Sequence, residues 1–422
     1  MHVILAAEDS EAELQLELQA SFAGAVARRL PAGLIEIDID LAQGERLPYL
    51  AFARQLLPNA KLLRVETIRA WAQETYSALL AHLPEGGPWS LHIAPYYGLR
   101  AGHHMGARAW HSFRLLREKG GRRPQVQNLK SRFQSHGSRV SDPKSRDLSR
   151  ERLEPLPVDA VAGKHRCGLI REAVLELLRQ KRRHLLRDLV CDATPFAADQ
   201  SLVQLLLTAP DSGFVSVAIA PLPFEQRHLI SAFPKGEVPI ARDKAAPSRA
   251  FAKLLEAEAR LGCAINAGET CADLGAAPGS WTYVAANRGA QVIAVDRSPL
   301  REDLMSNPRL CFVSGDAFQF TPPQPFDWLL CDLIAPADRT SELLLRWLRN
   351  GWCRRFVVTL KLKDTMNSGQ AERKMRGVND LPALETLEVL KRELPTLSSD
   401  LYLTRLSANK KEVCAFGTAH GQ

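Results

Sequence analysis

The sequence predicts an α/β chain with a Rossmann-like parallel sheet in its C-terminal half and an α+β region before it. Strand-like and helical segments alternate regularly from about residue 236 onward, as in a parallel sheet with crossover helices. A glycine-rich turn at 275–279 joins one of these strands to a helix. Three successive strands end in aspartates, at the edge where open α/β sheets bind ligands.

Three units are predicted, covering residues 1–87, 88–235 and 236–422. Alternating or continuous apolar runs predict strands, and apolar positions at helical spacing predict helices. In the first two units the predicted strands are 2–6, 33–39, 89–95 and 216–220, and the predicted helices are 12–28, 68–82 and 169–189. In the third unit the predicted strands are 270–274, 291–296, 310–313, 326–332, 355–363 and 410–416, and the predicted helices are 247–257 and 280–288.

Composition points to an ordinary globular protein, with 422 residues of which 45% are hydrophobic and 24% charged. No apolar run approaches the ~20 residues that span a bilayer, and residues 1–9 resemble a first strand rather than a signal peptide. The eight cysteines include no Cys-x-x-Cys pair, so we expect reduced thiols, no metal site and a cytoplasmic protein. No apolar stripe suggests a partner face, so a monomer is expected.

Positive charge is concentrated in one segment. Residues 114–152, in a predicted insertion of about 114–165, hold twelve basic and four acidic residues, and this excess equals the net charge of +8 of the whole chain. With few large apolar residues, the segment cannot form a core of its own. Two interpretations stay open: an arm that binds RNA phosphates, or a solvated insertion without a function.

The turn at 275–279 is the most informative motif. Its glycine spacing departs from Gly-x-Gly-x-x-Gly, which argues against a dinucleotide, and is typical of S-adenosylmethionine enzymes. Asp296, at the end of the next strand, can accept both ribose hydroxyls of a nucleoside, and Asp316 can reach an adenine amino group. Asp332 ends a further strand. The alternative is that each aspartate caps the helix that follows it.

Further polar residues stand at notable positions. Lys253 lies in the predicted helix 247–257, which has Ser248 near its start, and Lys361 lies inside an apolar strand. Glu412 lies in the last predicted strand. Each of these residues also has an ordinary structural interpretation: a lysine at a strand edge can extend its amino group to water, and an acidic side chain can lie on the protein surface.

Together these motifs resemble the FtsJ-type 2′-O-ribose methyltransferases. The matching residues are the Ser-Arg-x-x-x-Lys-Leu helix, the Asp-Leu-Gly-x-x-Pro-Gly-x-Trp turn, the Cys-Asp strand end, the Leu-Lys-Leu strand and the Glu-Val strand. The run 350–354 before Leu-Lys-Leu is similar to the RlmM family, whose members modify a cytidine of 23S ribosomal RNA. The resemblance covers about 236–418. It is looser in the N-terminal half, where 52–55 and 89–95 are similar to the family's ferredoxin-like, THUMP-type RNA-binding region.

The resemblance implies a class I methyltransferase domain with S-adenosyl-L-methionine as cofactor and RNA as partner. It implies a catalytic tetrad of Lys253, Asp332, Lys361 and Glu412. The implied cofactor-binding residues are Ser248, Gly275, Ala277, Pro278, Gly279, Ser280, Trp281, Asp296, Asp316 and Asp332.

The chemistry of the tetrad can be reasoned from its residue types. A ribose hydroxyl must lose its proton as it attacks the methyl group, and Lys361 is the expected general base. Its pKa must then fall, and burial and the like charge of Lys253 lower it. The negative charges of Asp332 and Glu412 raise the pKa of Lys361, so we expect these two residues to orient the lysines rather than to activate them. No metal is required, because a sulfonium methyl group is already electrophilic.

One residue departs from the RlmM pattern, which has glycine where this chain has Ser280. We expect that change to affect cofactor affinity, or Ser280 to cap the following helix. Competing hypotheses are a base or small-molecule methyltransferase of the same fold, a methyltransferase of the same fold that acts on tRNA or mRNA, a non-catalytic RNA-binding protein and, more distantly, a dehydrogenase. A base methyltransferase commonly has Asn/Asp-Pro-Pro-aromatic after its fourth strand, whereas Leu333-Ile334-Ala335-Pro336 follows here. The sequence leaves the modified nucleotide open.

Overall fold

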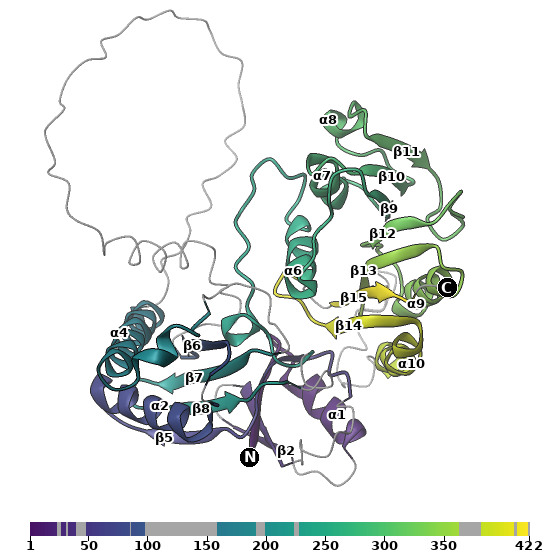
Figure 1. Cartoon of the computed structure of the whole chain (residues 1–422). Coiled ribbons are helices and arrows are strands. Elements are labelled where there is room, and N and C mark those ends of the chain that lie inside the picture. The colour runs from purple at the N-terminus through teal and green to yellow at the C-terminus, as the bar shows by residue number, and fades with distance from the viewer. Residues whose placement is uncertain are drawn as a thin grey trace, which may run out of the picture.

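The computed structural model describes residues 1–22, 27–30, 33–38, 48–84, 86–97, 158–190, 199–222, 228–362, 381–408 and 412–420. Three sheets divide these residues, two in the N-terminal half and one in the C-terminal half (Figure 1). The basic segment 114–152 therefore lies outside the described residues, whereas the predicted end of its insertion, residues 158–165, belongs to a helix. No helix in the described ranges is long and apolar enough to cross a membrane.

The first sheet has the strand order β2-β3-β1-β4. Its strands are β1 (His2–Ala6), β2 (Ala27–Arg29), β3 (Leu34–Ile37) and β4 (Ala53–Leu57), and helix α1 (Glu11–Ser21) follows β1. The predicted helix 12–28 was too long, because Ala27 pairs with Ile37 across β2 and β3. Pairing with a strand further along the chain overrides local helix propensity there.

The second sheet has the order β5-β8-β7-β6. Its strands are β5 (Lys61–Arg64), β6 (Trp89–Pro95), β7 (Ser201–Ala209) and β8 (Ser212–Ala218), with helices α2 (Ile68–His82), α4 (Val158–Lys181) and η3 (Arg183–Leu186). Helix α2 and strand β6 have the predicted bounds, and the Thr67 side chain caps α2 by accepting from Ala70 N at 3.1 Å. The predicted helix 169–189 instead starts earlier and ends at Lys181.

The predicted boundary at residue 87 does not coincide with a boundary between sheets. Strand β5 precedes that residue but belongs to the second sheet, because Lys61 pairs with Val215 of β8. Helix α2 packs against α4, so it belongs to the second sheet as well. The first sheet therefore ends with β4.

The third sheet is Rossmann-like, as predicted, with the order β11-β10-β9-β12-β13-β15-β14. Its strands are β9 (Thr270–Leu274), β10 (Gln291–Asp296), β11 (Leu310–Ser314), β12 (Phe326–Cys331), β13 (Cys353–Lys361), β14 (Ser398–Thr404) and β15 (Glu412–Ala419). Its helices are α6 (Phe251–Leu261), α7 (Ser280–Asn287), α8 (Glu302–Met305), α9 (Ala337–Arg349) and α10 (Leu381–Leu397). Strand β15 runs antiparallel to both of its neighbours.

Helices cover both faces of this sheet, as the nearly continuous apolar strands require. Trp328 and Leu330 of β12 pack with residues of α6 and α7. Leu329, between them, packs with residues of α9 and α10 on the opposite face. Successive side chains of a strand point to opposite faces, so one strand contributes to two cores.

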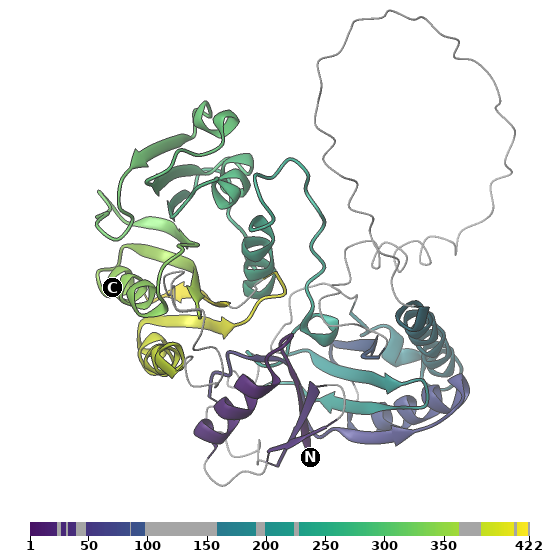
Figure 2. The ribbon, with the colours of Figure 1, turned by 180° about the vertical axis from the view of Figure 1, so that it is seen from behind.

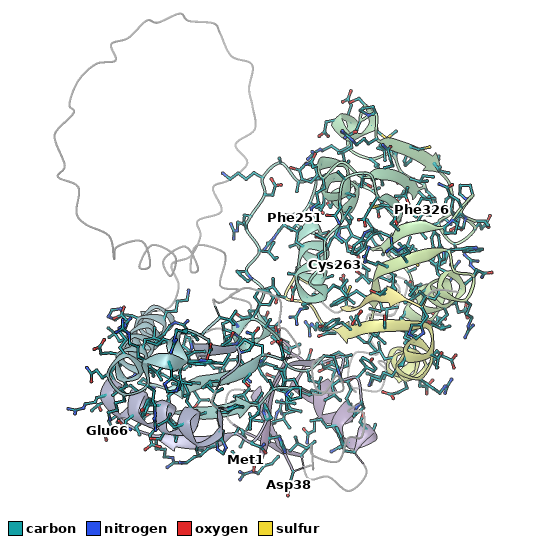
Figure 3. The ribbon with its side chains drawn as sticks, in the orientation of Figure 1. Met1, Asp38, Glu66, Phe251, Cys263 and Phe326 are labelled. Carbon is teal, nitrogen blue, oxygen red and sulfur yellow. The ribbon has the colours of Figure 1, made fainter. Side chains whose placement is uncertain are left out.

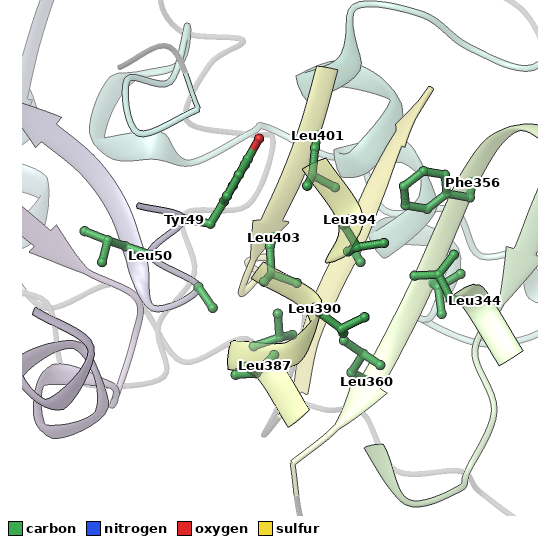
Figure 4. Packing of buried hydrophobic residues seen from close by; sticks show 14 of the residues in the cluster. Tyr49, Leu50, Leu344, Phe356, Leu360, Leu387, Leu390, Leu394, Leu401 and Leu403 are labelled. Atoms are coloured by element: carbon green, nitrogen blue, oxygen red, sulfur yellow. The ribbon is translucent and has the colours of Figure 1, made fainter. Parts of the chain in front are cut away.

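A buried interface joins the first sheet to the C-terminal domain. Tyr49 and Leu50 pack beside Leu387 of α10 and Leu403 of β14 (Figure 4). Helices α1 and α10 lie side by side in both views of the ribbon (Figures 1 and 2). A further link is made by the 3₁₀ turn η4 (Pro234–Gly236), whose Gly236 carbonyl accepts a hydrogen bond from Arg260 of α6 at 2.6 Å.

Candidate active site

Five parallel strands, β9 to β13, end at one edge of the third sheet. Lys361 is the last residue of β13, and Asp332 directly follows β12. Strand β15 begins at that edge because it is antiparallel, and its first residue, Glu412, is the cross-strand partner of Lys361. The topology therefore brings residues from distant parts of the chain to one edge.

All four residues of the predicted tetrad meet there. Lys361 Nζ lies 2.7 Å from Asp332 Oδ1 and 2.8 Å from Glu412 Oε1. Lys253 Nζ lies 3.0 Å from Asp332 Oδ2 and 2.6 Å from Glu412 Oε2. Each lysine bonds both carboxylates and each carboxylate bonds both lysines. We call these four residues the lysine–carboxylate cluster.

The cluster is largely withdrawn from water, since its side chains are between 8% and 17% exposed. Lys253 reaches it from α6, which runs from Phe251 to just before Cys263 (Figure 3). Apolar residues on the inner face of α6 pack against the sheet, and Ala250 O accepts from Trp281 Nε1 at 2.8 Å. The start of α6 is therefore held in place by α7.

The electrostatics of the cluster differ from the expectation for Lys361. Burial lowers the pKa of this lysine, but the carboxylates of Asp332 and Glu412 outweigh burial and raise the pKa above its usual range. Burial raises the pKa of Asp332, but the two lysines outweigh it and lower that pKa. The predicted fall in the pKa of Lys361 is therefore wrong for the protein without ligands, because two carboxylates neutralise its charge.

The glycine-rich turn follows β9 with an unusual backbone. Gly275 has φ +77° and Gly279 has φ +105°, a region that favours glycine. A Cβ on Gly275 would lie 2.6 Å from Leu333 Cδ2, and one on Gly279 would collide with Leu304. Both the positive φ angles and the close packing of Leu333 and Leu304 therefore favour glycine at these two positions.

The two aspartates beyond the turn lie at the carboxyl ends of the adjacent strands β10 and β11. Asp296 Oδ2 accepts from Ala277 N at 3.0 Å and Asp296 Oδ1 from Ser298 N at 2.9 Å, so this side chain braces the turn. It does not cap the next helix, α8, whose N-cap is Arg301. Asp316 lies two residues beyond β11 and accepts from Phe318 N at 3.0 Å. That backbone hydrogen bond, together with the exposed Arg297, lowers the pKa of Asp316.

Ser280, the residue that departs from the RlmM pattern, does not cap a helix. The N-cap of α7 is Gly279, and no side chain caps that helix. Ser280 Oγ instead lies 2.6 Å from Ser248 Oγ, so the two serines join the segment before α6 to the start of α7. Trp281 is 2% exposed and makes the second link between these helices. Pro278 O accepts from Arg301 N at 3.1 Å, which ties the turn to α8.

One residue of this edge, the aspartate of the Asp-Leu-Gly turn, was given no role in the sequence prediction. Asp273 lies in β9 just before the turn, is 2% exposed, and accepts from Thr282 Oγ1 at 2.6 Å. Burial, with the charges of Asp332 and Asp296 nearby, raises its pKa to about 7. The sequence signal that could have identified Asp273 was an acidic residue inside the apolar run 270–274.

Part of the chain matches known proteins. Residues 246–395 match the family model of the FtsJ-like methyltransferases. "Ribosomal RNA large subunit methyltransferase M" of Thauera aminoaromatica is 32% identical over 212 residues, which are 49% of this chain and 55% of that protein. The protein of the same name from Marinomonas sp. (strain MWYL1) is 40% identical over 138 residues, 31% of this chain and 39% of that protein. The chain thus matches about half, or less, of the length of these relatives.

Likeness to solved structures is weaker. The crystal structure of TrmN from Thermus thermophilus is 16% identical over 99% of both chains, with a TM-score of 0.27. A score that low supports no argument about this chain.

Proposed function

We propose that the protein methylates a ribose 2′-hydroxyl of RNA, specifically of a cytidine in 23S ribosomal RNA. The match of residues 246–395 to the FtsJ-like methyltransferases and the similarity to the two ribosomal RNA methyltransferases support this proposal. The observation that supports this proposal most is the lysine–carboxylate cluster, which places an amino group within 3 Å of two carboxylates at the ligand-binding edge of the sheet. We propose that it acts in the cytoplasm as a monomer.

S-adenosyl-L-methionine is the cofactor that this type of domain implies, and the turn fits it. Gly275 and Gly279 give the turn a positive-φ backbone at the carboxyl edge of the sheet, and Asp296 and Asp316 offer carboxylates at the ends of the neighbouring strands β10 and β11. We propose that Asp296 holds the ribose hydroxyls and Asp316 the adenine amino group. The backbone from Ala277 to Ser280, with Ser248 beside it, would hold the methionine part.

When bound, this cofactor supplies a methyl group carried on a positively charged sulfur. Lys361 Nζ then accepts the proton of the 2′-hydroxyl as the oxygen attacks, and Asp332 and Glu412 hold Lys361 and Lys253 in fixed orientation. A hydroxyl that enters the cluster lies within hydrogen-bond reach of a base that is already positioned, which is the main source of rate in such a reaction.

Lys361 needs an unprotonated amino group for this role, although its pKa is raised without ligands. An RNA strand that covers the cluster excludes water, and desolvation lowers the pKa of a lysine. The carboxylates of Asp332 and Glu412 orient the amino group of Lys361, and the bound RNA lowers its pKa by excluding water. The rate should therefore depend steeply on pH.

The N-terminal half would hold the RNA. A group of exposed cations lies at and just beyond the end of α4, and the structure gives these side chains no ion pair within the described ranges: Lys181, Arg182, Arg183 and Arg187. Positive side chains at such density bind phosphates without reading sequence. We propose that the second sheet and its helices serve as a THUMP-type RNA-binding region, with these cations as its phosphate contacts. The segment 114–152 would add to them.

The test is to incubate the protein with methyl-labelled S-adenosyl-L-methionine and unmodified 23S ribosomal RNA, and then to locate the label by nuclease mapping. Label on a ribose 2′-oxygen of a single cytidine is the expected result. Label on a base would overturn the ribose assignment and leave the domain type intact. Labelling of tRNA or mRNA, but not of ribosomal RNA, would overturn the proposal that ribosomal RNA is the substrate.

A further inference from the structure

Ile334 is the most exposed large apolar side chain of the described residues, at 87%. Leu16 follows at 53%, and the other exposed large apolar side chains in those ranges are between 38% and 45% exposed. Partial exposure of apolar residues is common on protein surfaces. An isoleucine with nearly all of its side chain in water has no packing role of its own.

The connection that carries Ile334, between β12 and α9, is anchored on both sides. Leu333 packs against the glycine-rich turn, and Ala335 is 6% exposed. Pro336 forms an isolated bridge with Lys361, the last residue of β13. Because its neighbours are held against the protein, the connection itself presents Ile334 to the outside.

This connection begins at the lysine–carboxylate cluster. Asp332, two residues before Ile334, bonds Lys361 at 2.7 Å. Two residues of extended chain span at most about 7 Å. The side chain of Ile334 therefore lies within reach of the nucleotide whose hydroxyl enters the cluster.

We propose that Ile334 packs against the base of the target nucleotide and so helps to position its ribose at Lys361; this inference rests on the proposed function. RNA that is modified or read at single nucleotides is recognised with its bases splayed out, and apolar side chains can pack on base faces. Isoleucine offers no hydrogen-bonding group. It therefore positions the base without selecting among the four bases, and the choice of cytidine is made by other residues.

The test compares Ile334→Ala with Val389→Ala, a matched control, since Val389 is also β-branched and exposed (38%) but lies on α10, outside the proposed RNA-binding region. Both variants and the wild type methylate a synthetic RNA that contains the mapped target, either intact or abasic at that nucleotide. We expect I334A to lower kcat/KM on the intact RNA about tenfold, as for loss of an apolar contact to a substrate. The control should match the wild type, and both variants should bind S-adenosylhomocysteine normally.

On the abasic RNA, I334A should equal the wild type, because the contact partner is missing. Equal rates on the intact RNA would overturn the inference, and so would an unchanged penalty on the abasic RNA. A change of sedimentation in Ile334→Asp without RNA would assign the residue to a protein interface instead. A wild-type protein that methylates no RNA would refute the proposed function, and this inference with it.

Discussion

Lys361 and Glu412 are cross-strand partners at the open edge of the third sheet, with Lys361 Nζ 2.8 Å from Glu412 Oε1. An antiparallel strand inserted between β13 and β14 makes this contact possible, since only a strand of reversed direction begins where the parallel strands end. The pair, with Asp332 and Lys253, forms a charge-balanced cluster that is partly shielded from water.

Replacing Lys361 by arginine separates a proton-accepting role from a purely electrostatic one. Arginine keeps the positive charge for Asp332 and Glu412 but does not lose a proton in proteins. We expect K361R to lower the single-turnover rate about 10³-fold, within the usual range for loss of a general base, with cofactor affinity nearly unchanged. Lys244→Arg, at an exposed site before α6, is the control. Near-normal turnover in K361R would rule out Lys361 as the base.

The rate should rise with pH. A base works in its unprotonated form, and a raised pKa means that this form is scarce at neutral pH and grows about tenfold per pH unit. Single-turnover rates should therefore climb with a slope near one on a logarithmic scale from about pH 6.5 until Lys361 is deprotonated in the RNA complex. A rate that does not change between about pH 6.5 and pH 9 would contradict proton loss from Lys361.

Asp296 should govern cofactor affinity. Its two oxygens accept from Ala277 N and Ser298 N, and an asparagine can accept with one oxygen only. We expect Asp296→Asn to raise the Kd for S-adenosylhomocysteine about 10- to 100-fold in calorimetric titration, as for loss of charge-assisted hydrogen bonds. Asp303→Asn, on the exposed helix α8, should leave the Kd unchanged. A raised Kd in Asp303→Asn with an unchanged Kd in Asp296→Asn would show that Asp296 does not bind the cofactor.

The cations after α4 should account for part of the salt dependence of RNA binding. Each phosphate contact with single-stranded RNA contributes about −0.7 to the slope of log affinity against log salt. The double variant R182A/R183A should therefore reduce the slope by about 1.4, measured by filter binding at several salt concentrations. The matched pair R28A/R29A, on β2 of the first sheet, should not change it. An equal reduction of the slope in R182A/R183A and R28A/R29A would indicate that only the net charge of the protein matters.

The interface between the halves depends on a buried ion pair. Glu17 of α1 lies 2.7 Å from Lys391 of α10 and accepts from Ala51 N and Phe52 N. Glu17→Gln removes the buried partner of Lys391 and leaves only the exposed Glu388 at 2.6 Å, so we expect a loss of about 3 kcal/mol in the free energy of unfolding. Glu74→Gln, at a surface ion pair with Lys61, should cost under about 1 kcal/mol. Urea denaturation measures both; equal losses would deny the buried pair a special role.

The sequence predicted most of the third sheet because its strands are apolar and short and its turns carry glycine or aspartate. It also predicted α2 and β6 to the residue, where a cap or an alternating pattern marks the ends. The four residues of the lysine–carboxylate cluster were identified from motifs, since each stands in a recognisable local run. These features are local, so they can be read from neighbouring residues in the chain.

Only the tertiary structure decided what depends on contacts between distant segments. Strand β5 joined the second sheet because its partner, β8, lies about 150 residues further along the chain. Ser280 bonded Ser248 in place of a helix end. The pKa of Lys361 rose because Asp332 and Glu412 approach it together, and their combined field exceeds the effect of burial. Electrostatic energy depends on distance and solvent exposure, and both are set by how the strands are arranged in space rather than by their order in the sequence.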